Sequence, residues 1–157
     1  MSRICSVRLR ADLRGDMRTK FILIVAGVFM VSGLAAVGAQ ATKSVNDGVY
    51  SEAQAKRGDA LYKENCATCH GDNLEGSGPM PALAGKDFLA SWEGKTVGDL
   101  YDKTFTTMPA TAPGSLTPAQ AADIVSYMLA SSRYKAGTGD LETKTEALQQ
   151  IKIEAPK

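Results

Sequence analysis

Five consecutive residues, Cys66-Ala67-Thr68-Cys69-His70, bring together two thiols and an imidazole. Cys-x-x-Cys-His is the signature at which a c-type haem is attached to a polypeptide. Residues three positions apart lie on one face of a helical turn. The two sulfurs therefore reach the same edge of the haem, where they add across its vinyl groups, and His70 offers its imidazole to the iron. We expect one covalently attached haem c.

Other uses of this cysteine pair find less support. A thioredoxin-type pair needs a βαβ pattern around it, and the sequence shows none. A structural zinc site needs four ligands, but His70 is the only histidine, and the third cysteine, Cys5, lies far upstream. A disulfide between Cys66 and Cys69 would leave His70 without a role.

A methionine is the expected second axial ligand, because a His/Met pair closes both axial positions of a haem iron and no second histidine exists. Met128 lies in an apolar helical pattern and is expected in the core. Met80 follows His70 by only ten residues, so it would need a very short loop around the ring. Met108 precedes Pro109, which ends a helix. We expect His70 and Met108 to bind the iron, with Met80 and an open sixth position as alternatives.

Two further residues are expected near the haem. Metal-bound histidines usually donate their second ring N–H to a carbonyl group, and the irregular segment 76–81, which ends at Pro81, has carbonyl groups free for this. The alternative for Pro81 is a plain rigid turn. Trp92 is expected to donate its indole N–H to a haem propionate, or else to pack in the protein with another hydrogen-bond partner.

The N-terminal region has the pattern of an export signal. An apolar run over 21–37 follows Arg18 and Lys20, and small residues occupy the positions that signal peptidase reads. We predict a signal peptide over 1–41, with Met17 as a possible true start and a periplasmic or otherwise exported product. The alternative is an uncleaved anchor facing the periplasm, because the run reaches the lower end of the ~17–25 residues that span a bilayer.

The charge of the remaining chain is mildly negative. Residues 42–157 hold twelve Lys and Arg against fifteen Asp and Glu, which gives −3. The sequence lacks the clustered basic face of a nucleic-acid-binding protein. Net charge does not identify a protein partner.

Three helices are expected to position these groups. Each begins at a hydroxyl N-cap followed three residues later by a side chain that can reach back to the cap, namely Ser51 with Gln54, Thr96 with Asp99, and Thr117 with Gln120. Gly58 is costly inside the first helix, which suggests that another helix approaches it closely.

The rest of the chain leaves room for one small all-α domain. We expect a polar lead-in over 42–48, the domain over 49–134, and a C-terminal tail over 135–157 that forms a short helix or stays partly ordered. A covalently held haem would supply a large part of so small a core.

The order of these motifs resembles that of class I cytochromes c, over about residues 49–134. The matching motifs are Gly58-x-x-x-Tyr62, Cys66-Ala-Thr-Cys-His70-Gly71, Pro81-Ala-Leu83, Thr107-Met108-Pro109 and Ile124-Val-x-Tyr127-Met-Leu129. The resemblance implies three main helices and several short ones around one haem, with the first and last helices crossing near Gly58. It also implies that Pro81 lends its carbonyl to His70 and that Met108 is the sixth ligand.

A finer similarity links three segments to cytochrome domains that are attached to, or work with, quinoprotein alcohol dehydrogenases. These segments are 81–92, 114–118 and 148–153. Since the sequence holds no such dehydrogenase domain, the similarity implies a separate quinoprotein dehydrogenase as electron donor.

These resemblances together imply a monohaem electron carrier, not an enzyme, that meets donor and acceptor proteins in transient contacts. An open sixth position would instead imply a gas sensor or a peroxidase. An uncleaved anchor would favour a fixed electron-transfer subunit of a membrane oxidoreductase.

Overall fold

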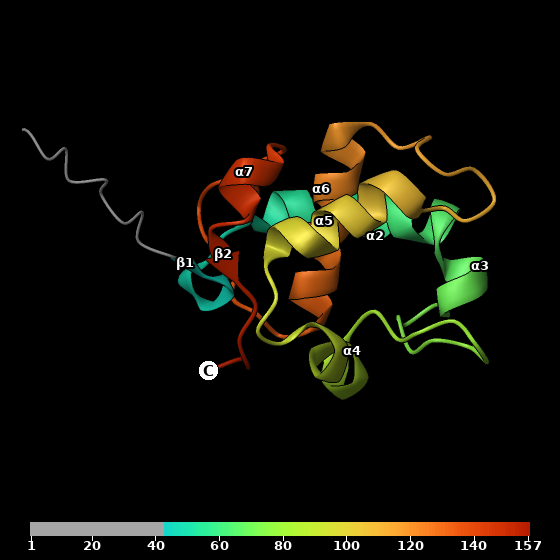
Figure 1. The fold of residues 1–157 in the computed structure, drawn as a ribbon, viewed down its shortest axis with the longest axis horizontal. Coiled ribbons are helices and arrows are strands. Elements are labelled where there is room, and N and C mark those ends of the chain that lie inside the picture. The colour runs from blue at the N-terminus through green and yellow to red at the C-terminus, as the bar shows by residue number, and fades with distance from the viewer. Residues whose placement is uncertain (1–42) are drawn as a thin grey trace, which may run out of the picture. The chain divides into compact units, whose positions relative to one another are not determined.

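The computed structural model describes residues 43–157, so the predicted signal peptide and the start at Met17 lie outside the described part (Figure 1). The elements are β1 (Lys43–Ser44), the 3₁₀ helix η1 (Val45–Asp47), α2 (Glu52–Asn65), α3 (Ala67–His70), α4 (Gly85–Trp92), α5 (Val97–Thr107), α6 (Pro118–Ser131), α7 (Thr145–Leu148) and β2 (Ile151–Lys152). The expected helical fold, with three main helices and several short ones, is confirmed. Within residues 43–157, no helix has the length and apolar character needed to cross a bilayer.

The largest packing contact in the fold joins α2 to α6. A methyl group placed on Gly58 would overlap the backbone carbonyl of Asp123 and lie 2.9 Å from the Cβ of Tyr127. The rings of Tyr62 and Tyr127 meet beside this point, with their centroids 5.4 Å apart. The expectation that another helix closely approaches Gly58 is confirmed.

Substitution of Gly58 by alanine should therefore destabilise the protein, although alanine is the better helix former by ~1 kcal/mol. Because the added methyl would meet backbone, α2 and α6 must move apart, and overpacking of this kind typically costs ~1–3 kcal/mol. We expect a lower free energy of unfolding in urea. The matched control is Gly139→Ala, whose methyl would have no neighbour within 4 Å; equal stability of the two variants would contradict the prediction.

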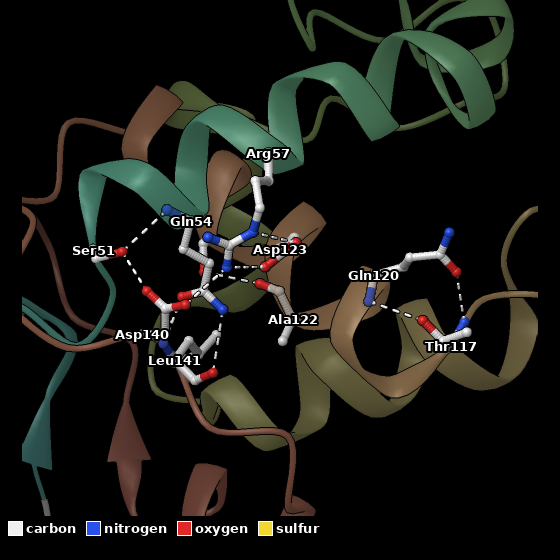
Figure 2. A network of polar contacts seen from close by, with 10 residues as sticks. Ser51, Gln54, Arg57, Thr117, Gln120, Ala122, Asp123, Asp140 and Leu141 are labelled. Carbon is white, nitrogen blue, oxygen red and sulfur yellow. Dashed lines mark hydrogen bonds and ion pairs between the residues drawn. The ribbon is translucent and has the colours of Figure 1, made fainter.

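The helix starts follow the sequence with one exception. Reciprocal capping boxes form at Thr96 with Asp99 and at Thr117 with Gln120, and Figure 2 shows the second of them. Ser51 caps α2 by accepting from the N–H of Gln54. The Gln54 side chain does not reach back to Ser51, so that part of the prediction is wrong. Its amide is buried and pairs with both backbone groups of Leu141, at 3.2 and 2.5 Å.

The lead-in and the tail are built into the same compact unit as the rest of the described chain. β1 and β2 form a parallel pair, with Lys43 opposite Ile151. The tail contains the short helix α7, one of the two expected alternatives, and adds the strand β2, which was not expected. It also contributes buried apolar side chains, namely Leu141, Leu148, Ile151 and Ile153. The core therefore extends into both terminal segments.

An ion-pair network fastens the tail to α2 and α6 (Figure 2). Arg57 donates from Nε and Nη2 to the two carboxylate oxygens of Asp123, each at 3.0 Å. Its Nη2 also donates to Asp140 at 2.8 Å, and the Ser51 hydroxyl donates to the other oxygen of Asp140. Because Asp123 is nearly buried and Asp140 is half exposed, we assign most of the stabilisation to the first pair.

Asp140 gives this network a pH dependence. Hydrogen bonds from Ser51 and then Arg57 lower the pKa of its carboxyl group. A lowered pKa in the folded state stabilises the protein above the unfolded value of ~3.9, and this contribution is lost as the pH falls through the folded-state value. We expect Asp140→Asn to reduce the free energy of unfolding by ~0.5 kcal/mol at pH 7, as for an exposed ion pair. The difference from wild type should vanish in urea titrations near pH 2; a constant difference would contradict this account.

Candidate functional site

The Cys-x-x-Cys-His motif forms the turn between α2 and the end of α3. The N–H of Cys66 donates to the carbonyl of Tyr62 at 2.8 Å, and the N–H of His70 donates to the carbonyl of Cys66 at 3.0 Å. Cys66 is half-buried, Cys69 is exposed, and both thiols are free. The structure therefore presents the two sulfurs and the imidazole from one helical turn.

The imidazole of His70 is held by the carbonyl of Pro81, whose oxygen lies 2.8 Å from Nδ1. Since a carbonyl oxygen only accepts, Nδ1 must carry the ring hydrogen, and Nε2 keeps its lone pair. His70 is buried, at 7% exposure. The contact that the resemblance implied between these residues is present, and it leaves Nε2 able to bind a metal.

The loop from residue 71 to 83 fixes the position of the Pro81 carbonyl. The N–H of Gly76 donates to the carbonyl of His70 at 2.8 Å, and Leu83 donates to Leu74 at the same distance. Gly76 has a φ of 80°, and a methyl group on it would lie 2.7 Å from the Met80 carbonyl oxygen. Only glycine combines this φ with so close an approach of backbone.

On the side of the site next to α2, two ionisable side chains are shielded from solvent. Tyr62 is completely buried, and its hydroxyl donates to the carbonyl of Gly71. Burial, followed by the proximity of Cys66, raises the pKa of Tyr62. Burial also raises the pKa of the Cys66 thiol to about 11, with a smaller contribution from Cys69. Both groups are therefore protonated at neutral pH.

The three methionines occupy different environments. Met128 is buried in the core on α6, as expected. Met80 is 38% exposed on the loop before Pro81. Met108 is half-buried directly after α5, and its N–H caps this helix by donating to Thr104 at 3.2 Å. In Figure 1 the C-terminal end of α5 points towards the end of the molecule that carries α3. Met108 as the sixth ligand stays a prediction.

Trp92 ends α4 and is half-buried. Its ring stacks on Phe88 with the centroids 6.4 Å apart, and the ammonium of Lys95 lies 4.8 Å from the ring centroid. Such a cation above an indole is attracted by the ring electrons. These contacts are those of packing, the alternative that the sequence left open, and a hydrogen bond from Trp92 to a propionate stays a prediction.

The residues present fit a covalently bound haem. Two free thiols and an imidazole with an available Nε2 are the donor set that haem c requires. Among residues 43–157, no cluster of three or more His, Cys, Asp or Glu residues is arranged to hold a metal ion. The zinc alternative therefore finds no ligand set in the described part of the chain.

Sequence reasoning missed how the loop after His70 is supported. Leu74 is buried although its φ of 61° is unusual for a residue with a side chain. The spacing of glycines at 71 and 76, both with positive φ, was the one local signal that this loop folds back sharply. Tyr62 lies in one of the motifs that carry the resemblance, but nothing in the sequence indicated that its hydroxyl would donate to the carbonyl of Gly71.

Comparisons with known proteins agree with this geometry. Residues 53–128 match the family described as cytochrome C oxidase, cbb3-type, subunit III. Cytochrome c-551 of Bacillus subtilis (strain 168) is 38% identical over 74 residues, which cover 45% of this chain and 66% of that relative. The chain thus spans slightly less than two thirds of its relative.

Among solved structures, the sulfane dehydrogenase SoxCD from Paracoccus pantotrophus aligns with 73% of this chain and 61% of its own, at 26% identity and a TM-score of 0.46. The attachment motif, the helical fold, the His70–Pro81 contact and the family match lead to one assignment. They support a class I monohaem c-type cytochrome with covalently bound haem c.

Proposed function

We propose that this protein is a single-electron carrier of the periplasm and not an enzyme. The observation that carries the proposal is the hydrogen bond from His70 Nδ1 to the carbonyl of Pro81. It fixes the imidazole with its free nitrogen available for iron, and the loop that holds it is rigidly hydrogen-bonded. When bound, haem iron supplies reversible one-electron chemistry between its ferrous and ferric states.

The roles of the individual residues follow from their positions. The sulfurs of Cys66 and Cys69 would hold the haem covalently, and His70 Nε2 would bind the iron. Met108 would close the other axial position, and a closed iron does not readily bind a substrate. Pro81 keeps the proton of His70 on Nδ1 and orients the ring.

The donor and acceptor are proposed by class. The sequence similarity to cytochrome domains that work with quinoprotein alcohol dehydrogenases supports a quinoprotein dehydrogenase as donor. The description of the matching family refers to an oxidase subunit, and this supports a terminal oxidase as acceptor. The apolar run followed by small residues supports export to the periplasm.

The test is an optical spectrum of the haem-loaded protein, oxidised and reduced, with and without carbon monoxide. We expect a far-red iron–methionine band in the oxidised protein, full reversibility, and no change with carbon monoxide. A missing band together with ready carbon monoxide binding would overturn the carrier proposal in favour of a sensor or peroxidase. Cell fractionation tests the location: a membrane-bound product would instead favour a fixed subunit.

A further inference from the structure

The C-terminal tail is fastened to α5, the helix that leads to the proposed sixth ligand. α5 packs against α7 as well as against α6. Figure 1 shows α7 beside the start of α5, at the end of the molecule away from α3. Met108 directly follows the last residue of α5, and its N–H donates to the carbonyl of Thr104. The position of Met108 therefore depends on how α5 is held.

The side chain of Gln149 joins the tail to the capping box of α5. The Thr96 hydroxyl donates to Oε1 of Gln149 at 2.7 Å, and Nε2 of Gln149 donates to Asp99 at 3.2 Å. Thr96 and Asp99 are also the two side chains that cap this helix reciprocally. One amide of the tail thus pairs with both capping side chains, so the first turn of α5 and the tail form one hydrogen-bonded unit.

The backbone of the tail lies directly on α5 at Gly98. A methyl group on this buried glycine would lie 2.8 Å from the backbone nitrogen of Gln149. A glycine inside a helix costs stability, and here it leaves room for the tail. About one turn further along α5, the hydroxyl of Thr145 donates to Asp102 at 2.8 Å. The contacts of the tail therefore extend over the first half of the helix.

The segment that enters α5 is held by the same tail. The N–H of Ile153 donates to the carbonyl of Lys95, and the N–H of Gly94 donates to the carbonyl of Ile153, both at 2.9 Å. Ile153 and Leu148 are fully buried. The tail is therefore anchored in the core where it holds the start of α5.

The loop after Met108 holds this residue less firmly. Among residues 43–157, the backbone hydrogen bonds of this loop are local, from Ala112 to Pro109 at 2.8 Å and from Ser115 to Ala112 at 3.2 Å. Residues 110–115 are exposed, and exposed segments with few buried contacts open most easily. Met108 lies six residues beyond Asp102, about 9 Å along a helix, so we assign its position mainly to α5.

We propose that Gln149 and Thr145 are positioning residues, which hold Met108 at the sixth position of the haem iron by fixing α5. The inference rests on the proposed ligation by Met108. Release of the tail would let α5 move, and an external ligand could then take the place of Met108 more often. The tail thereby sets how firmly the sixth position is closed.

The experiment titrates imidazole into the oxidised haem-loaded protein and follows the loss of the far-red iron–methionine band. The test variant combines Thr145→Val with Gln149→Ala, which removes the three side-chain hydrogen bonds between the tail and α5. The matched control is Asp140→Asn, which weakens the bonds of the same tail to Ser51 and Arg57 and leaves those to α5 intact. Thr145→Ser is the conservative variant, because it keeps the hydroxyl.

The apparent affinity for imidazole rises in proportion to the population of the open state. We expect the double variant to bind imidazole about tenfold more tightly, since three modest hydrogen bonds are lost. Asp140→Asn and Thr145→Ser should stay within about twofold of the wild type. The α5 amides, including that of Met108, should exchange their hydrogens faster in the double variant than in the control, as measured by NMR.

Gly58→Ala separates positioning from a general loss of stability, because it loosens α2 against α6 without touching the tail. It should keep the wild-type affinity for imidazole, whereas Thr145→Val and Gln149→Ala should each raise the affinity on their own. Equal affinities in the double variant, Asp140→Asn and Gly58→Ala would overturn the inference alone. A wild-type protein without the far-red band would overturn the ligation by Met108, and the inference with it.

Discussion

Protein in which Cys66 and Cys69 are both replaced by serine should contain no covalently bound haem. The two thiols are free and lie on one turn that ends at His70, and no other cysteine lies among residues 43–157. A serine hydroxyl does not form the thioether, so the attachment should fall from complete to none. Haem-stained denaturing gels and the mass of the intact protein measure this.

Cys5→Ser provides the control for these substitutions. Cys5 lies in the predicted signal peptide, so this variant should keep its haem. Each single variant, at Cys66 or Cys69, should keep one thioether bond at most. Haem retained by the double variant after denaturation would show that attachment uses other residues, and the assignment of the motif would fail.

Met108→Ala should lower the reduction potential by on the order of 0.1 V or more, because axial ligands set this potential over a range of ≈0.8 V. Loss of the thioether sulfur removes the ligand that raises the potential and opens the sixth position. Redox titration measures the first effect, and carbon monoxide binding to the reduced protein measures the second. The far-red band should disappear.

The two other methionines are the matched controls. Met80→Ala should leave the band and the potential unchanged, since Met80 is exposed on the loop before Pro81. Met128→Ala should keep the band but reduce the free energy of unfolding by ~2–5 kcal/mol, as for a core truncation. A lost band in Met80→Ala together with an intact band in Met108→Ala would transfer the ligand assignment to Met80.

The parts of the fold that could be predicted are those set by short-range chemistry. Thr96 and Thr117 begin helices because their hydroxyls accept from the N–H three residues later, and both boxes formed. Gly58 indicated the helix crossing. A glycine inside a helix costs stability, so its presence suggests that another helix packs too closely to leave room for a side chain.

The parts that could not be predicted depend on residues far apart in the chain. Gln54 matched the capping pattern, but the two backbone groups of Leu141, 87 positions away, offered its amide two hydrogen bonds in a buried setting. A buried amide gains more from full pairing than from a solvent-exposed cap. The strand β2 pairs with β1 over a similar separation, and two residues leave no alternating pattern to detect.

The site shows the same division. The motif names Cys66, Cys69 and His70 because their chemistry needs a fixed spacing. The loop that supports these residues could not be predicted in the same way. It depends on the unusual conformation of Leu74 and on the close approach of Gly76 to the Met80 carbonyl, and no residue type indicates these contacts.

The pairing of β1 with β2 sets an order of events in time. Lys43 pairs with Ile151, so the two terminal segments can pair only when nearly all of the chain is present. The attachment turn at residues 66–70 is complete some eighty residues earlier. Closing so long a loop is slow compared with forming a helical turn. The backbone hydrogen bonds of the attachment turn join residues only three or four positions apart, so the turn itself does not depend on the pairing of the two terminal strands.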